Sequence, residues 1–381
     1  MYSASEMAEK LNVSVQTLRN WDKSGKLVAS RTPTGRLFYT QEQYLEVSGK
    51  QKYKVTGEGL DAIAGKVVLI TGGTGSLGYA LTERIADAAK KVIIYSRCEL
   101  KQAKMREAFA SKTNIRYMIG DIRDADRLTS ALRGVDICIH AACMKRVETC
   151  TYNPFEAVKS NVMGSVNVVE ACITNGVAKS LLVSTDKACA PATLYGGTKF
   201  VAEQIFINGN NYATRNTKFT VTRYGNVFGS NGSVRSLFEQ QALKGHVKVT
   251  DANMTRFFMS MEEAVNLNLF ALNNTIGGEI FIPKLKGTTI TAFAQTFAPG
   301  VPIEFIGLRG YEKIHEDLIS KTEMMYVVDC GENYKIVPPS VSVNAVGWDV
   351  SYPDEPKIEP FEYTSDKVTQ FTADELRALE K

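Results

Sequence analysis

From about residue 65 onward, short runs of consecutive apolar residues alternate with stretches of helical periodicity. The clearest apolar runs are Val67–Ile70, Val92–Tyr95, Ile115–Ile119, Val135–His140 and Leu181–Val183. A continuous apolar run of this length is typical of a parallel strand that is buried on both faces. Strands that alternate with helices predict an α/β fold, here a Rossmann-type doubly wound parallel sheet.

The first fifty residues follow a different pattern. Ser3 and Glu6 have the spacing of a capping box before a short helix that ends near Leu11. Ser14 is placed to cap a second helix, with apolar residues at helical spacing and a stop at Gly25. Residues 27–39 then predict a two-stranded wing with its turn at residues 34–35, and a further helix begins at residue 40.

This order of elements resembles the winged helix-turn-helix of MerR-like and excisionase-like proteins. DNA readers of that type use basic residues on the second helix and the wing. Residues 1–50 hold seven Lys or Arg against five Asp or Glu, so the net charge is weak. Both DNA binding and a domain kept for protein contacts stay open. The basic residues placed to meet DNA are Arg19, Lys23, Lys26, Arg31 and Arg36.

The two patterns divide the chain of 381 residues. We expect a winged helix-turn-helix at residues 1–49, a polar linker at 50–64 and a catalytic domain at 65–381. Within the catalytic domain, a cofactor-binding core should cover about 65–227. A smaller substrate lobe should lie mostly in 228–381 and end in a helix capped by Thr372.

Composition adds mainly exclusions. The net charge of +4 does not by itself argue for nucleic acid, and the three histidines are too dispersed to indicate a metal site. No apolar run reaches the roughly 18 residues that a membrane span needs, and no signal peptide opens the chain. Seven scattered cysteines without a C-x-x-C pair are typical of reduced thiols. We therefore expect a cytoplasmic protein.

A glycine-rich turn follows the first strand directly and leads into a helix. Its spacing is Gly72-x-x-Gly75-x-x-Gly78. Glycines at such a turn let the backbone approach a pyrophosphate, which then faces the helix N-terminus. A structural loop is the plain alternative, but the position between strand and helix predicts a dinucleotide site.

The end of the second strand bears on the choice of dinucleotide. Ser96 and Arg97 stand where an NAD site usually has an acidic residue for the ribose, and Glu99 comes late. An arginine here suits the 2′-phosphate of NADP. The sequence therefore favours NADP, with a merely solvated Arg97 as the alternative.

Two pairs of residues carry candidate chemistry. Tyr195 and Lys199 are four residues apart, so on a helix they share one face. Lys199 is expected to lower the pKa of the Tyr195 phenol, so that Tyr195 can take a proton from a sugar hydroxyl. Asp186 and Lys187 form a second acid/base pair, which simple hydride transfer does not need. A surface ion pair is the alternative reading of that second pair.

From about residue 65 to the end, the chain resembles the extended short-chain dehydrogenase/reductases. It is most similar to the soluble, inverting UDP-N-acetylglucosamine 4,6-dehydratases of the pseudaminic-acid-pathway type. The supporting stretches are TGGTGSLG, YSR, GDIRD, HAA-x-x-K, STDKA, YGGTK, RYGNVFGSNGSV, MTRFF, GEIFIPK and GLRGYEKIHEDLIS. Membrane-bound relatives tend to have Met in place of Tyr195.

The resemblance implies a mechanism. Tyr195, helped by Lys199, would deprotonate the sugar 4-hydroxyl while NADP⁺ takes the C4 hydride, with Thr185 hydrogen-bonded to that hydroxyl. Lys187 would then act as base at C5, and Asp186 would protonate the departing 6-hydroxyl. NADPH would return the hydride to C6, and protonation of C5 from the other face would invert that carbon.

The resemblance also implies the remaining site residues. Departures at Asn231, Ala190, Thr193 and the Gly310-Tyr311 loop bear on the exact sugar and nucleotide. The cofactor residues implied are Gly72, Thr74, Gly75, Ser76, Leu77, Gly78, Ser96, Arg97, Asp121, Ile122, Ala141, Ala142, Lys145, Asn161, Tyr195 and Lys199. The substrate residues implied are Lys145, Asn226, Ser233, Arg256, Arg309 and Glu312.

Three functions are compatible with these motifs. The first is a UDP-N-acetylglucosamine 4,6-dehydratase that works as a homo-oligomer. The second is another sugar-nucleotide epimerase or oxidoreductase of the same class, which would not need the Asp186–Lys187 pair. The third is a DNA-binding regulator with a nucleotide-sensing Rossmann domain, which would not need Tyr195.

Overall fold

A computed structural model describes residues 2–11, 13–31, 37–39, 43, 59–213, 217–230, 234–308, 310, 312–338 and 358–379. The predicted wing turn, the helix from residue 40 and most of the predicted linker lie outside these residues. Within the described residues, no helix is long and apolar enough to cross a membrane.

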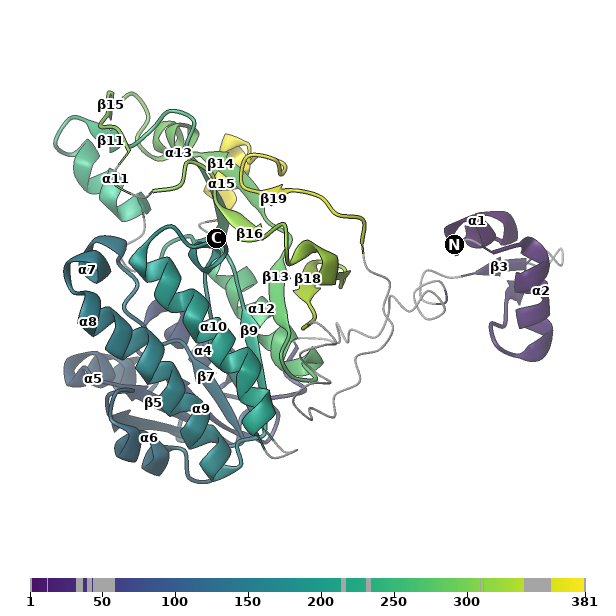
Figure 1. Cartoon of the computed structure of the whole chain (residues 1–381), viewed down its shortest axis with the longest axis horizontal. Coiled ribbons are helices and arrows are strands. Elements are labelled where there is room, and N and C mark those ends of the chain that lie inside the picture. Colours follow the sequence, from purple (N-terminus) through teal and green to yellow (C-terminus); the bar gives the residue numbers. More distant parts are fainter. Residues whose placement is uncertain are drawn as a thin grey trace.

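The catalytic domain is built on one nine-stranded sheet (Figure 1). All pairs from β6 to β13 are parallel, and β18 and β17 add an antiparallel edge. This confirms the doubly wound parallel sheet. The strand order is β17 (Val327–Asp329), β18 (Asn333–Ile336), β13 (Ile280–Pro283), β9 (Lys218–Thr222), β8 (Lys179–Val183), β7 (Ile137–His140), β4 (Val67–Thr71), β5 (Lys91–Ser96) and β6 (Ile115–Ile119).

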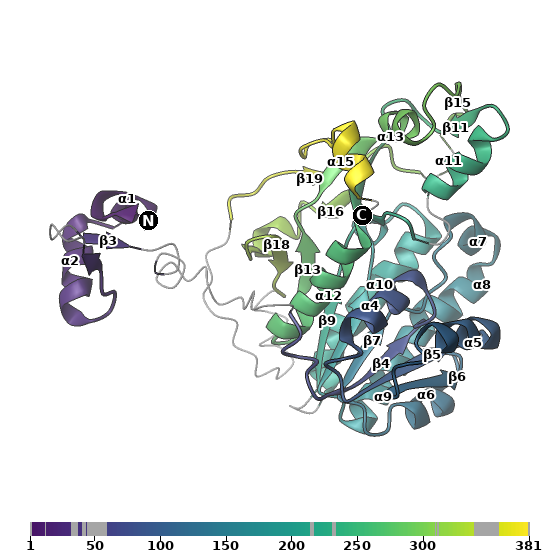
Figure 2. The ribbon, with the colours of Figure 1, turned by 180° about the vertical axis from the view of Figure 1, so that it is seen from behind.

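Helices cover both faces of this sheet. On the face toward the viewer in Figure 1, α6 (Ala125–Ala131), α9 (Gly164–Asn175) and α10 (Leu194–Tyr212) pack side by side. On the opposite face, seen in Figure 2, α4 (Ser76–Ile85) packs on α12 (Met261–Asn274), and α5 (Glu99–Ala108) follows β5. The strand order reverses between β4 and β7, where a doubly wound sheet binds its ligand.

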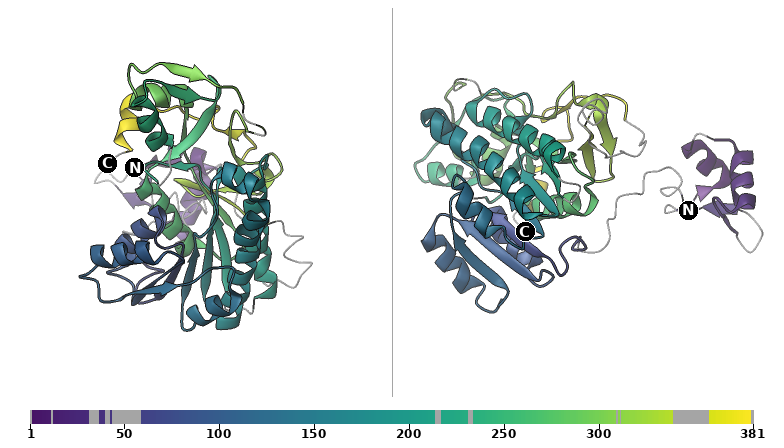
Figure 3. Two further views of the ribbon diagram at one scale, coloured as in Figure 1. Left: turned by 90° about the vertical axis from the view of Figure 1, so that its left-hand side faces the viewer. Right: turned by 60° about the horizontal axis from the view of Figure 1, so that its bottom comes forward.

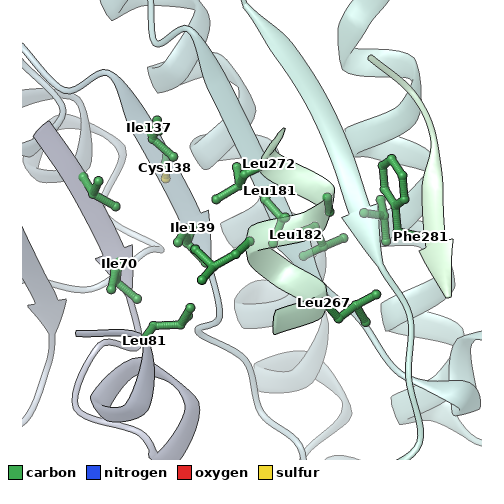
Figure 4. Packing of buried hydrophobic residues seen from close by; sticks show 14 of the residues in the cluster. Ile70, Leu81, Ile137, Cys138, Ile139, Leu181, Leu182, Leu267, Leu272 and Phe281 are labelled. Carbon is green, nitrogen blue, oxygen red and sulfur yellow. The ribbon is translucent and has the colours of Figure 1, made fainter. Parts of the chain in front are cut away.

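Apolar side chains of the strands fill the space beneath the helices (Figure 4). Ile70, Ile139 and Leu181 are fully buried on neighbouring strands, which explains why these segments read as continuous apolar runs. Ile63 is also fully buried in this core, and the backbone N–H of Ala62 donates to Asn273. Residues 59–64, which fall in the predicted linker at 50–64, thus pack on the catalytic domain.

The smaller lobe stands over the carboxyl ends of the strands (Figure 3). It has its own core around Phe238, Phe258 and Phe293. Within residues 228–381, the range predicted for the lobe, β13, β17 and β18 join the main sheet and α12 packs on it, so these four elements are not part of the lobe. Its elements are β10 (Asn226–Val227), α11 (Val234–Ala242), β11 (Val247–Val249), β12 (Thr255–Met259), β14 (Lys286–Thr289), α13 (Ile290–Phe297), β15 (Ile303–Phe305), β16 (Asp317–Ile319), η3 (Met324–Tyr326), β19 (Tyr363–Thr364) and α15 (Ala373–Ala378), the last capped by Thr372 as expected.

The N-terminal unit has a core of its own that includes Met7, Leu18 and Tyr39. Its helices are α1 (Ala4–Lys10) and α2 (Val15–Ser24), and the predicted capping box and left-handed Gly25 are both present. The wing strands β2 (Ser30–Arg31) and β3 (Leu37–Tyr39) pair antiparallel. A third strand, β1 (Tyr2–Ser3), pairs with β3 and was not predicted, because two residues are too short for a periodic signal.

Candidate active site

A cavity of about 650 Å³ opens where β4 and β7 end, between the sheet and the smaller lobe. It joins the glycine-rich turn, the end of β5, the residues after β7 and the turn after β8 in one space. Most of the predicted site residues line it: Gly72, Thr74, Gly75, Ser76, Leu77, Gly78, Ser96, Arg97, Asp121, Ile122, Ala141, Ala142, Lys145, Thr185, Lys187, Tyr195 and Asn226.

The glycine-rich turn has the geometry that a pyrophosphate requires. Gly72 has a φ of +66°, and a Cβ atom there would lie 2.9 Å from the backbone nitrogen of Ala142. The turn can therefore lie against the strand-end residues only with glycine at this position. Helix α4 begins directly after Gly75 with its N-terminus at the cavity. The described residues thus fit a dinucleotide.

The end of β5 forms the far end of the cavity. Arg97 Nη1 lies 3.8 Å from Asp121 Oδ2, while Arg123 makes the closer contact to that carboxylate at 2.7 Å. Burial raises the pKa of Asp121, but hydrogen bonds from Arg123 outweigh it, so the pKa is lowered and the carboxylate stays charged. Lys101, in the first turn of α5, lines the same end. Sequence reasoning missed Lys101, because nothing in the spacing marks it.

Tyr195 lies near the start of α10 and faces the cavity, as predicted. The expected lowering of its pKa by Lys199 is wrong for this structure. Burial raises the pKa of Tyr195 well above its usual value, and only a hydrogen bond with Thr185 opposes this. The Lys199 ammonium instead donates to the backbone carbonyl of Val183 at 2.8 Å, and burial lowers its own pKa.

The turn after β8 carries the acid/base pair. Lys187 Nζ donates to Asp186 Oδ1 at 3.0 Å, and the Thr185 hydroxyl donates to the same oxygen at 2.8 Å. Asp186 is fully buried, so it lies behind Thr185 and Lys187, which line the cavity. Burial would lower the pKa of Lys187, but Asp186 and Glu316 outweigh it and the pKa is raised. The plain alternative, a surface ion pair, is therefore excluded.

Helix α10 packs closely against this turn. A Cβ atom at Gly196 would collide with the backbone carbonyl oxygen of Lys187, whereas one at the neighbouring Gly197 would meet nothing within 4 Å. Gly196 thus fixes how near Tyr195 comes to Asp186 and Lys187. This explains in physical terms why a glycine follows the tyrosine.

Asn161 does not line the main cavity. Its side chain is buried and bonds both backbone groups of Met144, accepting from the N–H at 2.7 Å and donating to the carbonyl at 2.9 Å. It also donates to Thr198 on α10 at 3.0 Å. The structure therefore gives Asn161 the task of holding the segment after β7, while direct cofactor contact stays a prediction.

The predicted substrate residues fall into three groups. Lys145 and Asn226 line the main cavity. Arg256 and Glu312 line a smaller cavity of about 50 Å³ that shares Lys187 with the main one. Ser233 and Arg309 lie outside the described residues. Phosphate binding by Arg256 stays a prediction, because its guanidinium donates to the backbone carbonyls of Thr255, Lys313 and Ile314.

Two buried features behind the site were not predicted. Arg223 donates to both Glu203 and Glu323, and Glu203 also accepts from Ser184. This network ties the end of β9, α10, the end of β8 and the segment after β16 together. Glu316 approaches Lys187 from the smaller lobe at 3.5 Å. Only the tertiary fold brings these residues together, so no local pattern could reveal them.

His140, at the end of β7, has a structural role. Its ring shares hydrogen bonds with Thr71 at 2.7 Å and Ser165 at 3.3 Å. Burial lowers the pKa of His140 to about 3, so the imidazole is neutral at physiological pH.

Comparisons with known proteins identify the family of this chain. Residues 68–338 match the model of a family described as polysaccharide biosynthesis protein. The chain belongs to this family. Separately, residues 3–39 match the model of the MerR family of regulatory proteins, in agreement with the observed N-terminal unit.

Curated relatives carry two kinds of name. A UDP-N-acetylglucosamine 4,6-dehydratase (inverting) of Campylobacter jejuni (strain 81-176) is 43% identical over 81% of this chain and 95% of its own length. A UDP-glucose 4-epimerase of Rickettsia canadensis is 37% identical over 82% of this chain and 95% of its own length. Sequence similarity alone thus leaves two chemistries to be separated by the site.

Solved structures agree on the fold. The X-ray structure of Pen from Bacillus thuringiensis is 34% identical, covers 84% of this chain and 98% of its own, and has a TM-score of 0.75. DesIV of Streptomyces venezuelae, a dTDP-glucose 4,6-dehydratase solved with NAD and TYD bound, is 20% identical. It covers 65% of this chain and 86% of its own, with a TM-score of 0.59.

Proposed function

We propose that the protein is an NADP-dependent 4,6-dehydratase, a hydro-lyase that acts on UDP-N-acetylglucosamine and inverts C5. One observation carries the proposal. An acid/base pair, Asp186 and Lys187 at 3.0 Å, lies on the turn whose Thr185 and Lys187 line the same cavity as Tyr195 and the dinucleotide turn. Simple oxidation at C4 would use Tyr195 alone. The dehydratase relative at 43% identity supports the same substrate and reaction.

When bound along the glycine-rich turn and the end of β5, a nicotinamide cofactor would supply the acceptor for a hydride from C4 and the donor of that hydride to C6. Because burial raises the pKa of Tyr195, its phenol has to lose its own proton before the oxygen can take the proton of the 4-hydroxyl, with Thr185 hydrogen-bonded beside it. The resulting 4-ketone acidifies the C5 proton, which the Lys187 amine removes. The C6–O bond then breaks as the 6-hydroxyl receives a proton from Asp186 and leaves as water. C5 finally gains a proton from solvent on the face opposite Lys187, and Tyr195 returns to solvent the proton that it took from the 4-hydroxyl.

The proton balance of the pair follows from its hydrogen bond. At rest Lys187 is an ammonium, because its pKa is raised by Asp186 and Glu316 against the effect of burial. Transfer of one proton from Nζ to Asp186 creates the free amine and the carboxylic acid together. Elimination restores the ion pair. Because Asp186 is buried, its proton has to reach the sugar through the Thr185 hydroxyl or along Lys187.

NADP rather than NAD is the proposed cofactor. Arg97 and Lys101 both line the end of the cavity beyond β5, and they bring two positive charges to the place of a 2′-phosphate. Asp121, the acid at this end, already accepts from Arg123. These residues therefore suit a phosphate better than a free ribose hydroxyl.

Mass spectrometry after incubation with UDP-N-acetylglucosamine tests the proposal. The expected product has lost one water relative to the substrate, and it carries one solvent deuterium at C5 when made in D₂O. The second candidate is a UDP-sugar 4-epimerase, which the Rickettsia relative favours. A product of unchanged mass with an inverted C4 would decide for that alternative.

The N-terminal unit suggests a further role in binding duplex DNA. Arg19 and Lys23 are exposed on α2, the helix that reads DNA in this kind of module. Arg31 on the wing instead pairs with Asp22 at 2.8 Å, and Lys26 lies over the ring of Trp21. Self-assembly and a cytoplasmic location stay predictions from the sequence.

A further inference from the structure

Glu316 is a buried carboxylate that faces the proposed base from outside the catalytic turn. Its Oε1 lies 3.5 Å from Lys187 Nζ and 3.5 Å from Arg256 Nε, and its side chain is 4% exposed. It directly precedes β16, so it comes from the smaller lobe, whereas Asp186 and Lys187 come from the sheet. Lys187 is therefore held between two carboxylates from different parts of the fold.

The backbone of Glu316 is fixed on both sides. Its N–H donates to the Ser365 hydroxyl at 2.9 Å, and its carbonyl accepts from the Ser365 N–H at 2.9 Å. The Ser365 hydroxyl also bonds Thr255 at 2.6 Å. This arrangement leaves Glu316 little freedom to turn away from Lys187.

Two carboxyl oxygens around Lys187, Asp186 Oδ2 and Glu316 Oε2, are buried and have no hydrogen-bond partner among the described residues. A buried oxygen of this kind is costly as part of an anion and less costly as part of a protonated carboxyl group. Burial accordingly raises the pKa of Glu316, although Lys187 and Arg256 oppose this. The proton of the Lys187 ammonium can therefore also be held by the carboxyl group of Asp186 or by that of Glu316.

The small cavity of about 50 Å³ shares Lys187 with the main cavity and includes none of the glycine-rich turn. It is lined by Val147, Lys187, Ala192, Thr193, Arg256, Glu312, Lys313 and Glu316. This is room enough for a water molecule with several polar neighbours. A water molecule held here would lie beside both Glu316 and Lys187 and could carry a proton between them.

We propose that Glu316 is a positioning residue for dehydration: it shares the Lys187 proton with Asp186 and so sets the pH range in which Lys187 can act as base at C5. The inference rests on the proposed dehydratase function. The charged or titratable groups that face this cluster are Asp186, Arg256, Lys313 and Glu312, with Tyr195 on the main-cavity side.

The sign of the effect follows from charge. The Glu316 carboxylate stabilises the Lys187 ammonium, so Glu316→Gln should let Lys187 pass its proton to Asp186 more readily and should weaken the binding of a further proton by the cluster. Gln keeps the shape and can still accept a hydrogen bond from Nζ. At high pH the rate should stay within a few-fold of the parent, because a weaker base and a larger share of free amine offset each other.

The test is the pH dependence of elimination in single turnover with UDP-N-acetylglucosamine, followed by mass spectrometry, with hydride transfer to the cofactor followed by absorbance. The rate of elimination should fall off below a certain pH, which is the acid-side limb of its pH profile. In Glu316→Gln this limb should move to a pH about one unit lower than in the parent. Below the parent limb the variant should then be faster than the parent, while hydride transfer keeps its rate. Glu316→Asp should restore the limb at least in part.

Asp317→Asn is the matched control, since this neighbouring carboxylate pairs with Lys313 at 2.9 Å rather than with Lys187. Its limb should not move. An unmoved limb in Glu316→Gln, or an equal loss of both steps at every pH, would overturn the inference. If Glu316→Gln does not fold, the same readings on Glu316→Asp decide. A parent protein that releases no water would instead refute the proposed function.

Discussion

The ammonium of Lys187 donates a hydrogen bond over 3.0 Å to the carboxylate of the residue before it, Asp186. The two side chains differ in access, because Lys187 lines the cavity and Asp186 is fully buried. The base can therefore touch the sugar, whereas the acid acts through its neighbours. This asymmetry leads to the first prediction.

Lys187→Ala should leave cofactor binding and C4 oxidation intact but stop the loss of water. General base catalysis typically contributes about 10²–10⁴-fold to rate, so elimination should fall by that range while reduced cofactor accumulates. Tyr195→Phe should abolish the earlier hydride transfer as well. Absorbance of the reduced nicotinamide and mass spectrometry separate the two steps. Near-parental water release by Lys187→Ala would contradict the assignment.

Two adjacent glycines offer a matched pair of substitutions. Gly196→Ala places a Cβ atom against the carbonyl oxygen of Lys187, whereas Gly197→Ala meets nothing within 4 Å. A displacement of about 1 Å in a catalytic group can cost roughly 10²-fold in rate. Gly196→Ala should therefore lower kcat/KM by about that factor, and Gly197→Ala should stay close to the parent. Equal activities would show that this packing does not position the turn.

The cofactor prediction concerns charge at the end of β5. Arg97→Asp should weaken NADP and leave NAD less affected, because the variant cannot make a charge-assisted hydrogen bond to the 2′-phosphate. Such hydrogen bonds are worth about 1.5–3 kcal/mol, or roughly 10–100-fold in the ratio of the two Kd values. Arg133→Asp is a control, since Arg133 is exposed and does not line the cavity. Equal affinity of the parent for both dinucleotides would refute the preference.

The sequence predicts the sheet well because its strands are buried on both faces. Val67, Leu69 and Ile70 form one apolar run for that reason, and the glycine spacing after it marks the cofactor turn. Local patterns do not show how deeply a side chain is buried or which distant residues it contacts. The i, i+4 spacing suggested that Lys199 tunes Tyr195, but burial dominates the pKa of Tyr195 and Val183 takes the Lys199 ammonium.

Contacts between distant segments were missed for the same reason. Glu316 meets Lys187 only because β16 packs on the catalytic turn. Arg256 was predicted as a substrate residue from its own motif, and only the fold shows that carbonyls some sixty residues further along the chain accept from it. Likewise, nothing in the stretch around Ile63 shows that this residue fills a core position.

The core position of Ile63 gives a prediction on stability. Deletion of residues 1–50 should leave dehydratase activity largely intact, because the N-terminal unit has its own core. Deletion of residues 1–64 should destabilise the protein, since it removes the fully buried Ile63. In the full chain, Ile63→Ala should cost about 2–5 kcal/mol. Thermal and urea unfolding measure these effects, and loss of catalysis in the shorter deletion would show that the N-terminal unit belongs to the enzyme's working architecture.

The last prediction concerns DNA. If the N-terminal unit binds duplex DNA, exposed Arg19 and Lys23 on α2 should carry much of the phosphate binding, and Arg19→Ala with Lys23→Ala should weaken the affinity. Arg31→Ala should matter less, because Arg31 is already paired with Asp22 at 2.8 Å. For each side chain that binds a phosphate, its replacement by alanine should reduce the salt slope of log K by about 1.

Fluorescence titration of the full chain with a labelled duplex, at two salt concentrations, tests this ranking. Arg106→Ala provides a control of equal charge change, because Arg106 lies on α5 of the catalytic domain over the ring of Tyr117. Binding that falls steeply with salt and depends on Arg19 and Lys23 would assign the unit to DNA. No binding at low salt would favour a unit retained for protein contacts, which its own core and weak net charge would equally allow.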